Sequence, residues 1–282
     1  MKLFIQKVKF LFLIGAIAIP AYAQTVDPCT QNAKLTGSVD LPMKKGNEGI
    51  GKLKGSPYHY EIWVDKGGAQ GITLSWYGAK QGGGAAFKTS WTKPDCYLGR
   101  IGYFWGRGKE YPAYKNIYVD YNYTRSGRGT AGGHSYIGIY GWSRNPRASD
   151  PNERLIEYYI VDDWFGNQSL ADTVPPGIDT MGGAIIGTIT VDGAIYDIYK
   201  SLRVEKPSIE GTKTFTQIFS VRRNLRQCGT ISVTEHFKKW EELGLKLGRL
   251  REAKFLIEAG NGTGWLDMSY LSFSQEDQPR NP

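Results

Sequence analysis

The chain has 282 residues, with 35 Lys and Arg against 27 Asp and Glu and a formal net charge of +8. The basic residues are not clustered, so a nucleic-acid-binding protein is not indicated, and the three cysteines and three histidines lack zinc-ligand spacing. Glycine (36), tyrosine (18) and tryptophan (8) are abundant while helix-forming runs are scarce, which argues against a mainly helical protein.

The first 23 residues have the pattern of a secretory signal peptide. Three lysines precede an apolar run, and residues 21–23, Ala-Tyr-Ala, form a small-x-small cleavage site. A membrane anchor is the alternative, but the run is short for a spanning helix, which needs about 20 apolar residues. We expect cleavage after Ala23, which removes three lysines and no acids and lowers the charge from +8 to +5. The mature protein is then secreted.

The two ends of the mature chain lack a strand or helix pattern. We expect residues 24–55 to be a poorly ordered N-terminal segment and residues 275–282 to be a C-terminal tail. No internal repeat or second module interrupts residues 56–274, which we expect to form one folded domain.

From residue 71 onward, short runs of β-branched and aromatic residues alternate with Gly, Asn, Asp and Pro. This pattern is typical of antiparallel strands joined by tight turns, and so many strands in one chain predict a sandwich or barrel. Asp192-Gly193 favours a hairpin, because Asp-Gly accepts the positive φ of a two-residue turn. The expected strands are residues 71–78, 115–124, 135–142, 156–164, 185–193, 194–204, 213–223 and 229–234.

One segment breaks the strand pattern. Residues 234–248 place Phe237 and Trp240 on one helical face and lysines and glutamates on the other. Thr234 is the expected N-cap and Gly244 the expected C-terminal stop. We therefore predict one short helix packed on a β-structure.

The strand at residues 156–164 carries one glutamate, Glu157, among tyrosines. Since alternate residues of a strand share a face, Glu157 points the same way as Tyr159 and Val161. A lone acid in a strand is most often solvated. The alternative is that Glu157 points into an aromatic groove and does chemistry there.

The strand before it carries a stripe of aromatic residues on one face, formed by Tyr136, Gly138, Tyr140 and Trp142. Buried tyrosine hydroxyls need hydrogen-bond partners, so such a stripe suits a wet groove that stacks sugar rings. A partly exposed sheet face with ordinary tyrosines is the other interpretation, and composition does not decide between them.

A second acid, Glu258, lies late in an apolar strand and shares a face with Lys254 and Leu256. A carboxyl group among apolar neighbours loses solvation and can hold a proton near neutral pH. Two glutamates facing each other across a sugar groove are what retaining glycoside hydrolysis needs. Sequence spacing alone does not show that Glu157 and Glu258 meet.

Several motifs resemble those of glycoside hydrolase family 11 endo-β-1,4-xylanases between residues 58 and 273. Residues 155–164, LIEYYIVDDW, resemble the nucleophile motif, and residues 255–264, FLIEAGNGTG, resemble the acid/base motif. Residues 206–223 resemble the thumb hairpin with the strand after it, and residues 236–248 resemble the single helix of the family.

This resemblance implies an all-β fold, a β-jelly roll of two stacked, curved antiparallel sheets with one short α-helix and a thumb hairpin. It implies a secreted, monomeric endo-1,4-β-xylanase that cleaves internal bonds of xylan, needs no cofactor or metal, and has neither nucleic acid nor membrane as a partner. Residues 56–274 are then the catalytic domain, with Glu157 as nucleophile and Glu258 as acid/base. Glu157 should be ionised and Glu258 protonated, with the carboxyls about 5–5.5 Å apart.

The resemblance also assigns substrate-binding residues. Tyr140 and Tyr159 match tyrosines that hydrogen-bond the nucleophile and the sugar beside it, and Trp63 matches a tryptophan that stacks a xylose ring. The remaining matching residues are the cleft tyrosine Tyr136, the xylose-binding Arg203 and Gln217, and the thumb tip Pro207, Ser208 and Ile209.

Several features depart from the family pattern. Residues 147–153 are an insertion that we expect to lengthen a turn at the cleft edge, and Arg154 replaces a small residue or proline. The aromatic residue after the acid/base is missing, and Glu252 occupies the position of a frequent substrate-binding tyrosine. Ala86 aligns with the residue that tunes the acid/base, which favours a neutral pH optimum.

Three other classes of protein fit parts of the pattern. A carbohydrate-binding module or lectin is also a secreted, aromatic-rich sandwich, but it needs no paired glutamates. A jelly-roll β-glucanase is the alternative enzyme, although the thumb sequence favours xylan. A structural extracellular domain explains neither glutamate motif.

Overall fold

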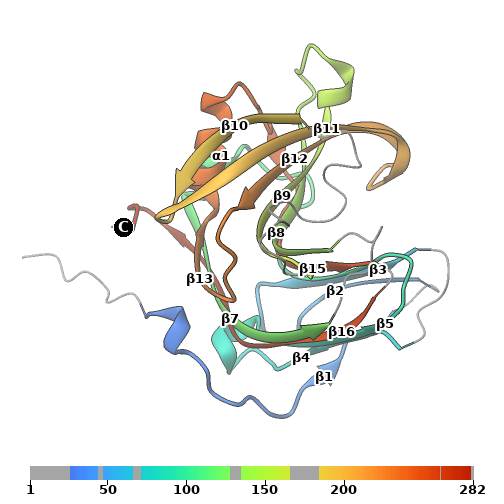
Figure 1. Cartoon of the computed structure of the whole chain (residues 1–282), viewed down its shortest axis with the longest axis vertical. Coiled ribbons are helices and arrows are strands. Elements are labelled where there is room, and N and C mark those ends of the chain that lie inside the picture. The colour runs from blue at the N-terminus through green and yellow to red at the C-terminus, as the bar shows by residue number, and fades with distance from the viewer. Residues whose placement is uncertain are drawn as a thin grey trace, which may run out of the picture.

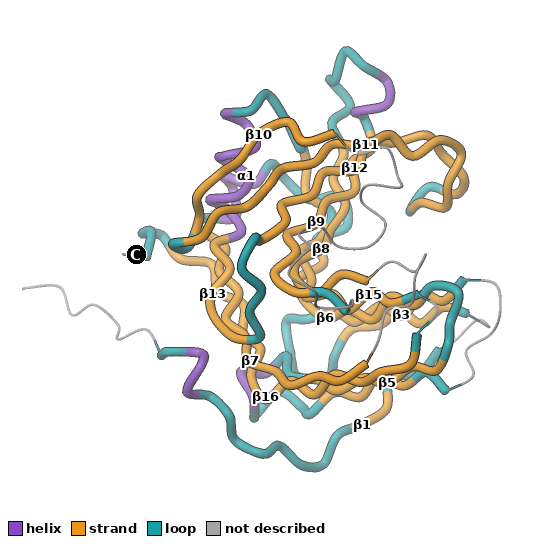
Figure 2. Tube along the Cα trace, in the orientation of Figure 1, coloured by secondary structure: helices purple, strands orange, loops and turns teal. Residues whose placement is uncertain are grey.

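The computed structural model describes residues 26–43, 47–65, 71–127, 135–165, 184–260 and 262–280. Two β-sheets stack on one another, and the larger one curves around a concave side (Figures 1 and 2). The expected signal peptide, residues 1–23, lies outside the described residues.

The smaller sheet has the strand order β1-β4-β5-β16-β7-β13. It forms the lower layer in Figure 1. Its strands are β1 (Val39–Asp40), β4 (Thr73–Trp76), β5 (Phe87–Thr92), β7 (Asn116–Gly127), β13 (Cys228–Ser232) and β16 (Thr263–Glu276).

The larger sheet has the order β10-β11-β12-β9-β8-β15-β6-β3-β2, and β14 (Arg249–Leu250) pairs with β8. Neighbouring strands run antiparallel, except that β9 and β12 are parallel. Its other strands are β2 (Glu48–Lys52), β3 (His59–Val64), β6 (Tyr97–Phe104), β8 (Ser135–Arg144), β9 (Leu155–Asp163), β10 (Ala184–Val191), β11 (Ala194–Ser208), β12 (Gly211–Arg222) and β15 (Glu252–Ala259).

The expected jelly roll is confirmed, and so is the hairpin turn at residues 192–193. Asp192 and Gly193 have φ values of 51° and 67°, and Val191 pairs with Ala194 across the turn. Two positive φ angles are the signature of the turn that matches strand twist. In the part of the chain that the structure describes, four short 3-10 turns connect other elements, namely η1 (Pro28–Thr30), η2 (Gly82–Gly84), η3 (Tyr111–Tyr114) and η4 (Pro151–Glu153).

Among the described residues there is one α-helix, α1 (Val233–Glu242). It buries Phe237 and Trp240, as its amphipathic pattern predicted. Gly244, with φ of 84°, follows the helix end as expected. The predicted N-cap was wrong: Thr234 lies inside the helix, where its hydroxyl accepts a hydrogen bond from the backbone N–H of Ile117.

Alternation along β9 separates the hydrophobic core from the concave face of the larger sheet. Tyr158 and Ile160 belong to the core between the sheets, with α1 packed over one end of it. Tyr159 and Val161 belong to a second buried cluster, rich in Tyr, Phe and Trp, on the concave side. The sequence prediction that Glu157 lies on this second face is therefore consistent with the packing of its neighbours.

The N-terminal segment has more regular structure than its sequence indicated. Within residues 24–55, β1 pairs with β4 and β2 pairs with β3. Neither strand is long enough to show a period, so pairing with a longer partner sets its conformation. At the other end, β16 continues to Glu276, and Arg280 forms ion pairs with Asp120 and Glu276.

The sequence left the pairing of the three cysteines open. Cys29 and Cys228 form a disulfide across 199 positions of sequence. The bridge joins η1 to the start of β13 and so fixes the N-terminal segment to the smaller sheet. Cys96 is buried and takes no part in this disulfide.

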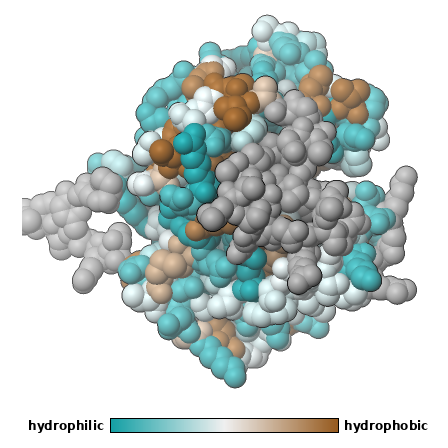
Figure 3. Space-filling view, viewed as in Figure 1, coloured by the Kyte–Doolittle hydropathy of each residue, from teal (hydrophilic) through white to brown (hydrophobic). Residues whose placement is uncertain are grey.

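The edge of the larger sheet is partly apolar on its exposed surface. In the face seen in Figure 3, hydrophobic residues gather in the upper part of the molecule, where β10 and β11 lie. The exposed apolar residues of these two strands include Ile185, Ile195, Leu202 and Val204. Among the described residues, no helix is long and apolar enough to cross a membrane.

Candidate active site

The concave side of the larger sheet holds a cavity of about 650 Å³. Strands β3, β6, β8, β9, β11, β12 and β15 all contribute side chains to it. All the residues to which the family resemblance assigns a catalytic or substrate-binding role line this one cavity: Trp63, Tyr136, Tyr140, Glu157, Tyr159, Arg203, Pro207, Ser208, Ile209, Gln217 and Glu258.

Glu157 lies near the middle of the sheet and is 7% exposed. It pairs with Trp142 on β8 and with Gln217 on β12. Tyr140 donates a hydrogen bond to Oε1 of Glu157 over 2.7 Å, and Gln217 donates one to Oε2. Trp142 donates its indole N–H to the hydroxyl of Tyr140, which fixes that hydroxyl as the donor to Glu157.

These surroundings act on the protonation of Glu157 in opposite directions. Burial raises the pKa of Glu157 to about 7, against the hydrogen bonds from Gln217 and Tyr140, which favour the carboxylate. Glu258 raises the pKa further and Arg203 lowers it. Burial is the largest of these influences, and it opposes the ionised state that was predicted for Glu157 from the sequence.

Glu258 comes from β15 and is 6% exposed. It pairs with Leu98 on β6 and with Tyr136 on β8. The Sγ of Cys96 donates to its Oε1 over 3.8 Å. Glu157 and Glu258 thus lie in one cavity, and Glu258 raises the pKa of Glu157, although their strands are far apart in sequence.

The position assigned to Ala86 was wrong. Ala86 is fully buried and is not part of the cavity wall, whereas Cys96 both lines the cavity and contacts Glu258. The stretch around residues 82–84 is rich in glycine and has no side-chain pattern from which to align it with the family. The alignment at Ala86 was therefore shifted.

Aromatic rings form the wall beside Glu157. The rings of Tyr136 and Tyr140 meet the ring of Tyr159 edge to face, at 5.4 and 5.0 Å between centroids. Phe219 stacks on Tyr159 at 4.4 Å. The stripe of tyrosines on β8 therefore lines a groove, which decides between the two interpretations left open by composition.

The hairpin of β11 and β12 forms the thumb (Figure 1), and its residues line one side of the cavity. Its tip is held by Ser208, whose hydroxyl donates to the carbonyl of Gly211 and accepts from the N–H of Glu210. Nε of Arg144, at the end of β8, lies 2.6 Å from Oε1 of Glu210. This ion pair connects the thumb tip to the sheet.

The insertion at residues 147–153 does not line the cavity. It contains η4, and Oε1 of its Glu153 lies 2.5 Å from Nζ of Lys200 on β11. The turn between β8 and β9 is longer, as expected, and η4 within it packs against β12.

A cluster of buried charges that was not predicted from the sequence lies at another part of the cavity. Arg100 and Glu61 line the cavity, and Lys254 and Glu252 lie behind them at 1% and 0% exposure. Nη2 of Arg100 lies 2.7 Å from Oε1 of Glu61, whose Oε2 lies 2.8 Å from Nζ of Lys254. Lys254 also pairs with Glu252. Glu252, expected at a substrate-binding position, is instead an ion-pair partner.

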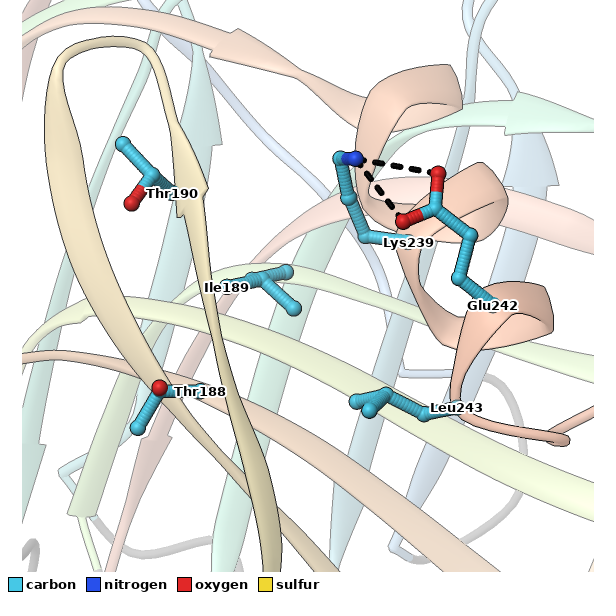
Figure 4. A pocket seen from close by; sticks show the side chains of 6 residues that line it. All are labelled: Thr188, Ile189, Thr190, Lys239, Glu242 and Leu243. Atoms are coloured by element: carbon cyan, nitrogen blue, oxygen red, sulfur yellow. Dashed lines mark hydrogen bonds and ion pairs between the residues drawn. The ribbon is translucent and has the colours of Figure 1, made fainter.

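A smaller cavity of about 320 Å³ lies between β10 and α1 (Figure 4). Thr188, Ile189 and Thr190 line it from the strand. The two charged side chains in its wall, Lys239 and Glu242, pair with each other. In the described ranges, no three His, Cys, Asp or Glu side chains are grouped so as to hold a metal ion.

Comparison with known proteins agrees with this geometry. A sequence profile of glycosyl hydrolases family 11 matches residues 56–269. Endo-1,4-beta-xylanase C of Fibrobacter succinogenes is 40% identical over 255 residues, which cover 90% of this chain and 38% of that protein. Endo-1,4-beta-xylanase A of Bacillus pumilus is 34% identical over 266 residues, which cover 92% of this chain and 93% of that protein.

The chain is also similar to a solved xylanase structure. The crystal structure of wild-type ENZbleach xylanase superposes with a TM-score of 0.83 and 58% sequence identity, over 92% of this chain and 95% of that chain. The chain spans less than half the length of the Fibrobacter protein and nearly all of the Bacillus protein.

Two stacked, curved sheets with a pair of buried glutamates in an aromatic groove define a glycoside hydrolase of the β-jelly-roll type. With the profile match, the sequence identities and the structural match together, the chain belongs to glycosyl hydrolase family 11.

Proposed function

We propose that the chain is a secreted endo-1,4-β-xylanase, with residues 56–274 as its catalytic domain. It cleaves internal β-1,4 bonds of xylan with retention of anomeric configuration, acting as a monomer without a cofactor. The single observation that supports this most strongly is that Glu157 and Glu258, from two different strands, line one aromatic cavity. The names of the relatives from Fibrobacter and Bacillus support xylan as the substrate.

In this mechanism Glu157 attacks the anomeric carbon while Glu258 gives its proton to the leaving oxygen. A glycosyl bond to Oε1 or Oε2 of Glu157 removes the negative charge that Glu258 experiences. Glu258 then acts as the base that takes a proton from water, and the resulting hydroxide releases the sugar from Glu157. Tyr140 and Gln217 hold the two oxygens of Glu157 in place for both steps.

Substrate contacts come from both sides of the groove. Trp63 on β3 offers a half-buried ring for a xylose unit, and Tyr136 and Tyr159 offer ring edges and hydroxyls. Arg203 has a buried Nε without a hydrogen-bond partner among the described residues, and a sugar hydroxyl would satisfy it. Pro207, Ser208 and Ile209 of the thumb cover the bound chain.

Secretion is supported by the disulfide between Cys29 and Cys228, because such bonds persist in oxidising compartments. It is also supported by the leader at residues 1–23 with its cleavage site after Ala23. Mass spectrometry of the exported protein tests this part of the proposal. We expect the mature chain to begin at Gln24, and a retained leader would contradict it.

Activity is tested by comparing reducing-sugar release from xylan and from carboxymethylcellulose. We expect xylan to be cleaved and carboxymethylcellulose not to be cleaved. Each glucose unit carries a hydroxymethyl group that a tight cleft excludes, and xylose lacks this group. Glu157→Gln and Glu258→Gln should each lower kcat more than about a hundredfold. Glu242→Gln on α1, which lines the smaller cavity and not the one that holds the two glutamates, is the control and should match the parent protein. Equal hydrolysis by Glu157→Gln would refute the proposal.

A further inference from the structure

Arg100 on β6 lies against the tyrosine that binds Glu157. Its guanidinium carbon is 4.6 Å from the ring centroid of Tyr140, and the side chain is 3% exposed. The hydroxyl of the same ring donates to Oε1 of Glu157 over 2.7 Å. Arg100, Tyr140 and Glu157 therefore form a continuous series of contacts on the concave face, built from three strands.

The guanidinium is held from behind by the charge cluster. Glu61 binds Nη2 of Arg100 and is itself held by Lys254, which also pairs with Glu252. Two basic and two acidic side chains make the cluster neutral. Nε and Nη1 of Arg100 have no hydrogen-bond partner among the described residues. The face of an aromatic ring is the contact that offsets part of the cost of burying such donors.

We infer that Arg100 is a positioning residue for the nucleophile: it holds and polarises Tyr140, so that the tyrosine hydroxyl donates strongly to Glu157 and favours its carboxylate form. This inference rests on the proposed role of Glu157. The ion-pair partner of Arg100 is Glu61, and its contact toward Glu157 is the ring of Tyr140, so we infer that it acts through that ring. A cation against the ring makes the phenol a better donor, and a better donor stabilises the carboxylate.

Removal of this cation should make Glu157 harder to ionise. The pKa of Glu157 would then rise above that of the parent protein, and the acid limb of activity would move to higher pH. Apart from Tyr140, through which Arg100 acts, the other groups that face Glu157 would be unchanged. They are Tyr136 on β8, Tyr159 on β9, Arg203 on β11, Gln217 on β12, Glu258 on β15 and Cys96 before β6.

The alternative is that Arg100 only anchors the charge cluster. The structure gives a way to separate these roles, because Glu61 keeps Lys254 as a partner when Arg100 is lost. A purely structural arginine would change the free energy of unfolding without changing the pKa of Glu157. An arginine that acts through Tyr140 would lose its effect when the tyrosine hydroxyl is absent.

The test is a pH titration of the side-chain carboxyl of Glu157 by NMR in protein labelled with ¹³C-glutamate, the signal being assigned with Glu157→Gln. For Arg100→Met we expect the titration of Glu157 to move up by roughly 0.5–1 pH unit. The acid limb of kcat/KM should move with it, while KM stays within about twofold. Arg100→Lys keeps the charge without the planar stack and should show a smaller shift in the same direction.

A double-mutant cycle with Tyr140→Phe tests the route of the effect. In the Tyr140→Phe background, Arg100→Met should move the titration of Glu157 by less than half as much. Arg280 is the matched control, since it lies 4.5 Å from the ring of Tyr118 and pairs with two carboxylates outside the cavity. Arg280→Met should leave the titration unchanged.

An unmoved titration in both Arg100 variants would overturn the inference, and so would a full shift in the Tyr140→Phe background. A rise of KM without a pH shift would also overturn it, because Arg100 would then bind substrate. Since the NMR readout needs no turnover, its result is separate from the test of xylan hydrolysis. If the parent enzyme hydrolyses xylan but the titration of Glu157 does not move in the Arg100 variants, only the role of Arg100 is refuted.

Discussion

Glu157 is a buried acid, and its burial makes the ionised form unfavourable in the folded protein. Its pKa is raised from 4.5 to about 7, chiefly by burial. Because the folded pKa exceeds the unfolded one, folding favours the protonated form. The stability from this preference is fully present below pH 4.5 and is lost as pH rises through 7. The same burial that a nucleophile needs in a water-poor site thus lowers the stability of the free enzyme at alkaline pH.

Replacing Glu157 with Gln should therefore stabilise the protein more at high pH than at low pH. A shift of this size corresponds to about 2–3 kcal/mol between pH 5 and pH 8. Urea unfolding of the parent protein and of Glu157→Gln at both pH values measures the difference. Glu242→Gln, an exposed glutamate on α1, is the control and should show no such difference. A pH-independent effect of Glu157→Gln would contradict the assigned pKa.

At the scale of elements, a surface ion pair connects the tip of the thumb to the end of β8. Arg144 and Glu210 are 32% and 39% exposed, and their atoms are 2.6 Å apart. A pair this exposed contributes roughly 0–1 kcal/mol, so it biases the position of the tip without locking it. Such a weak link leaves the hairpin free to shift beside the cavity.

Glu210→Gln should therefore loosen the thumb tip. We expect hydrogen exchange of the amides at residues 206–213 to quicken by about two- to threefold, with little change in overall stability. Lys238→Gln is the control, because it breaks a similarly exposed pair with Glu235 on α1. If the thumb amides exchange at the same rate in Glu210→Gln as in the parent protein, the ion pair does not restrain the thumb.

The elements differ in how far the sequence predicts them. Alternation assigned the faces of β8 and β9 correctly, since both strands are long and rich in aromatic residues. By contrast, β6 was not predicted, because Gly99 and Gly102 interrupt its pattern. A side chain at Gly99 would meet the hydroxyl of Tyr97 at 2.0 Å, so close packing rather than strand preference requires glycine there.

The candidate site, too, could be predicted from the sequence only in part. Glu157 could be placed on a face from its own strand, but the approach of Glu258 depends on β15 lying between β6 and β8. Spacing along the chain carries no information on that order, so only the family resemblance predicted the pair. The cluster around Arg100 was missed for the same reason, since Glu61 and Lys254 come from different strands and their pairing depends on register.

At the scale of the whole molecule, one covalent bond joins regions far apart in the chain. The disulfide from Cys29 to Cys228 closes a loop of 199 positions. Long loops lose the most entropy when cross-linked in the unfolded state, and the chain-entropy model gives about 5 kcal/mol for this length. The bond therefore stabilises the whole jelly roll and not only the N-terminal segment.

Cys29→Ser combined with Cys228→Ser should lower Tm by roughly 10 °C. Scanning calorimetry of the parent protein and of the variant provides the comparison. Cys96→Ser, which keeps the cross-link and exchanges one buried thiol, should lower Tm by much less. If the double variant melted at the parent temperature, the bond would not stabilise the fold.

The central claim is that Glu157 attacks the sugar and forms a covalent intermediate. The most direct measurement is mass spectrometry of the protein after incubation with a 2-deoxy-2-fluoro-xylobioside that carries a good leaving group. We expect the protein to gain the mass of one fluoroxylobiosyl unit, and peptide mapping to locate the label on Glu157. A label on another residue, or a product of inverted configuration from xylan, would contradict the account.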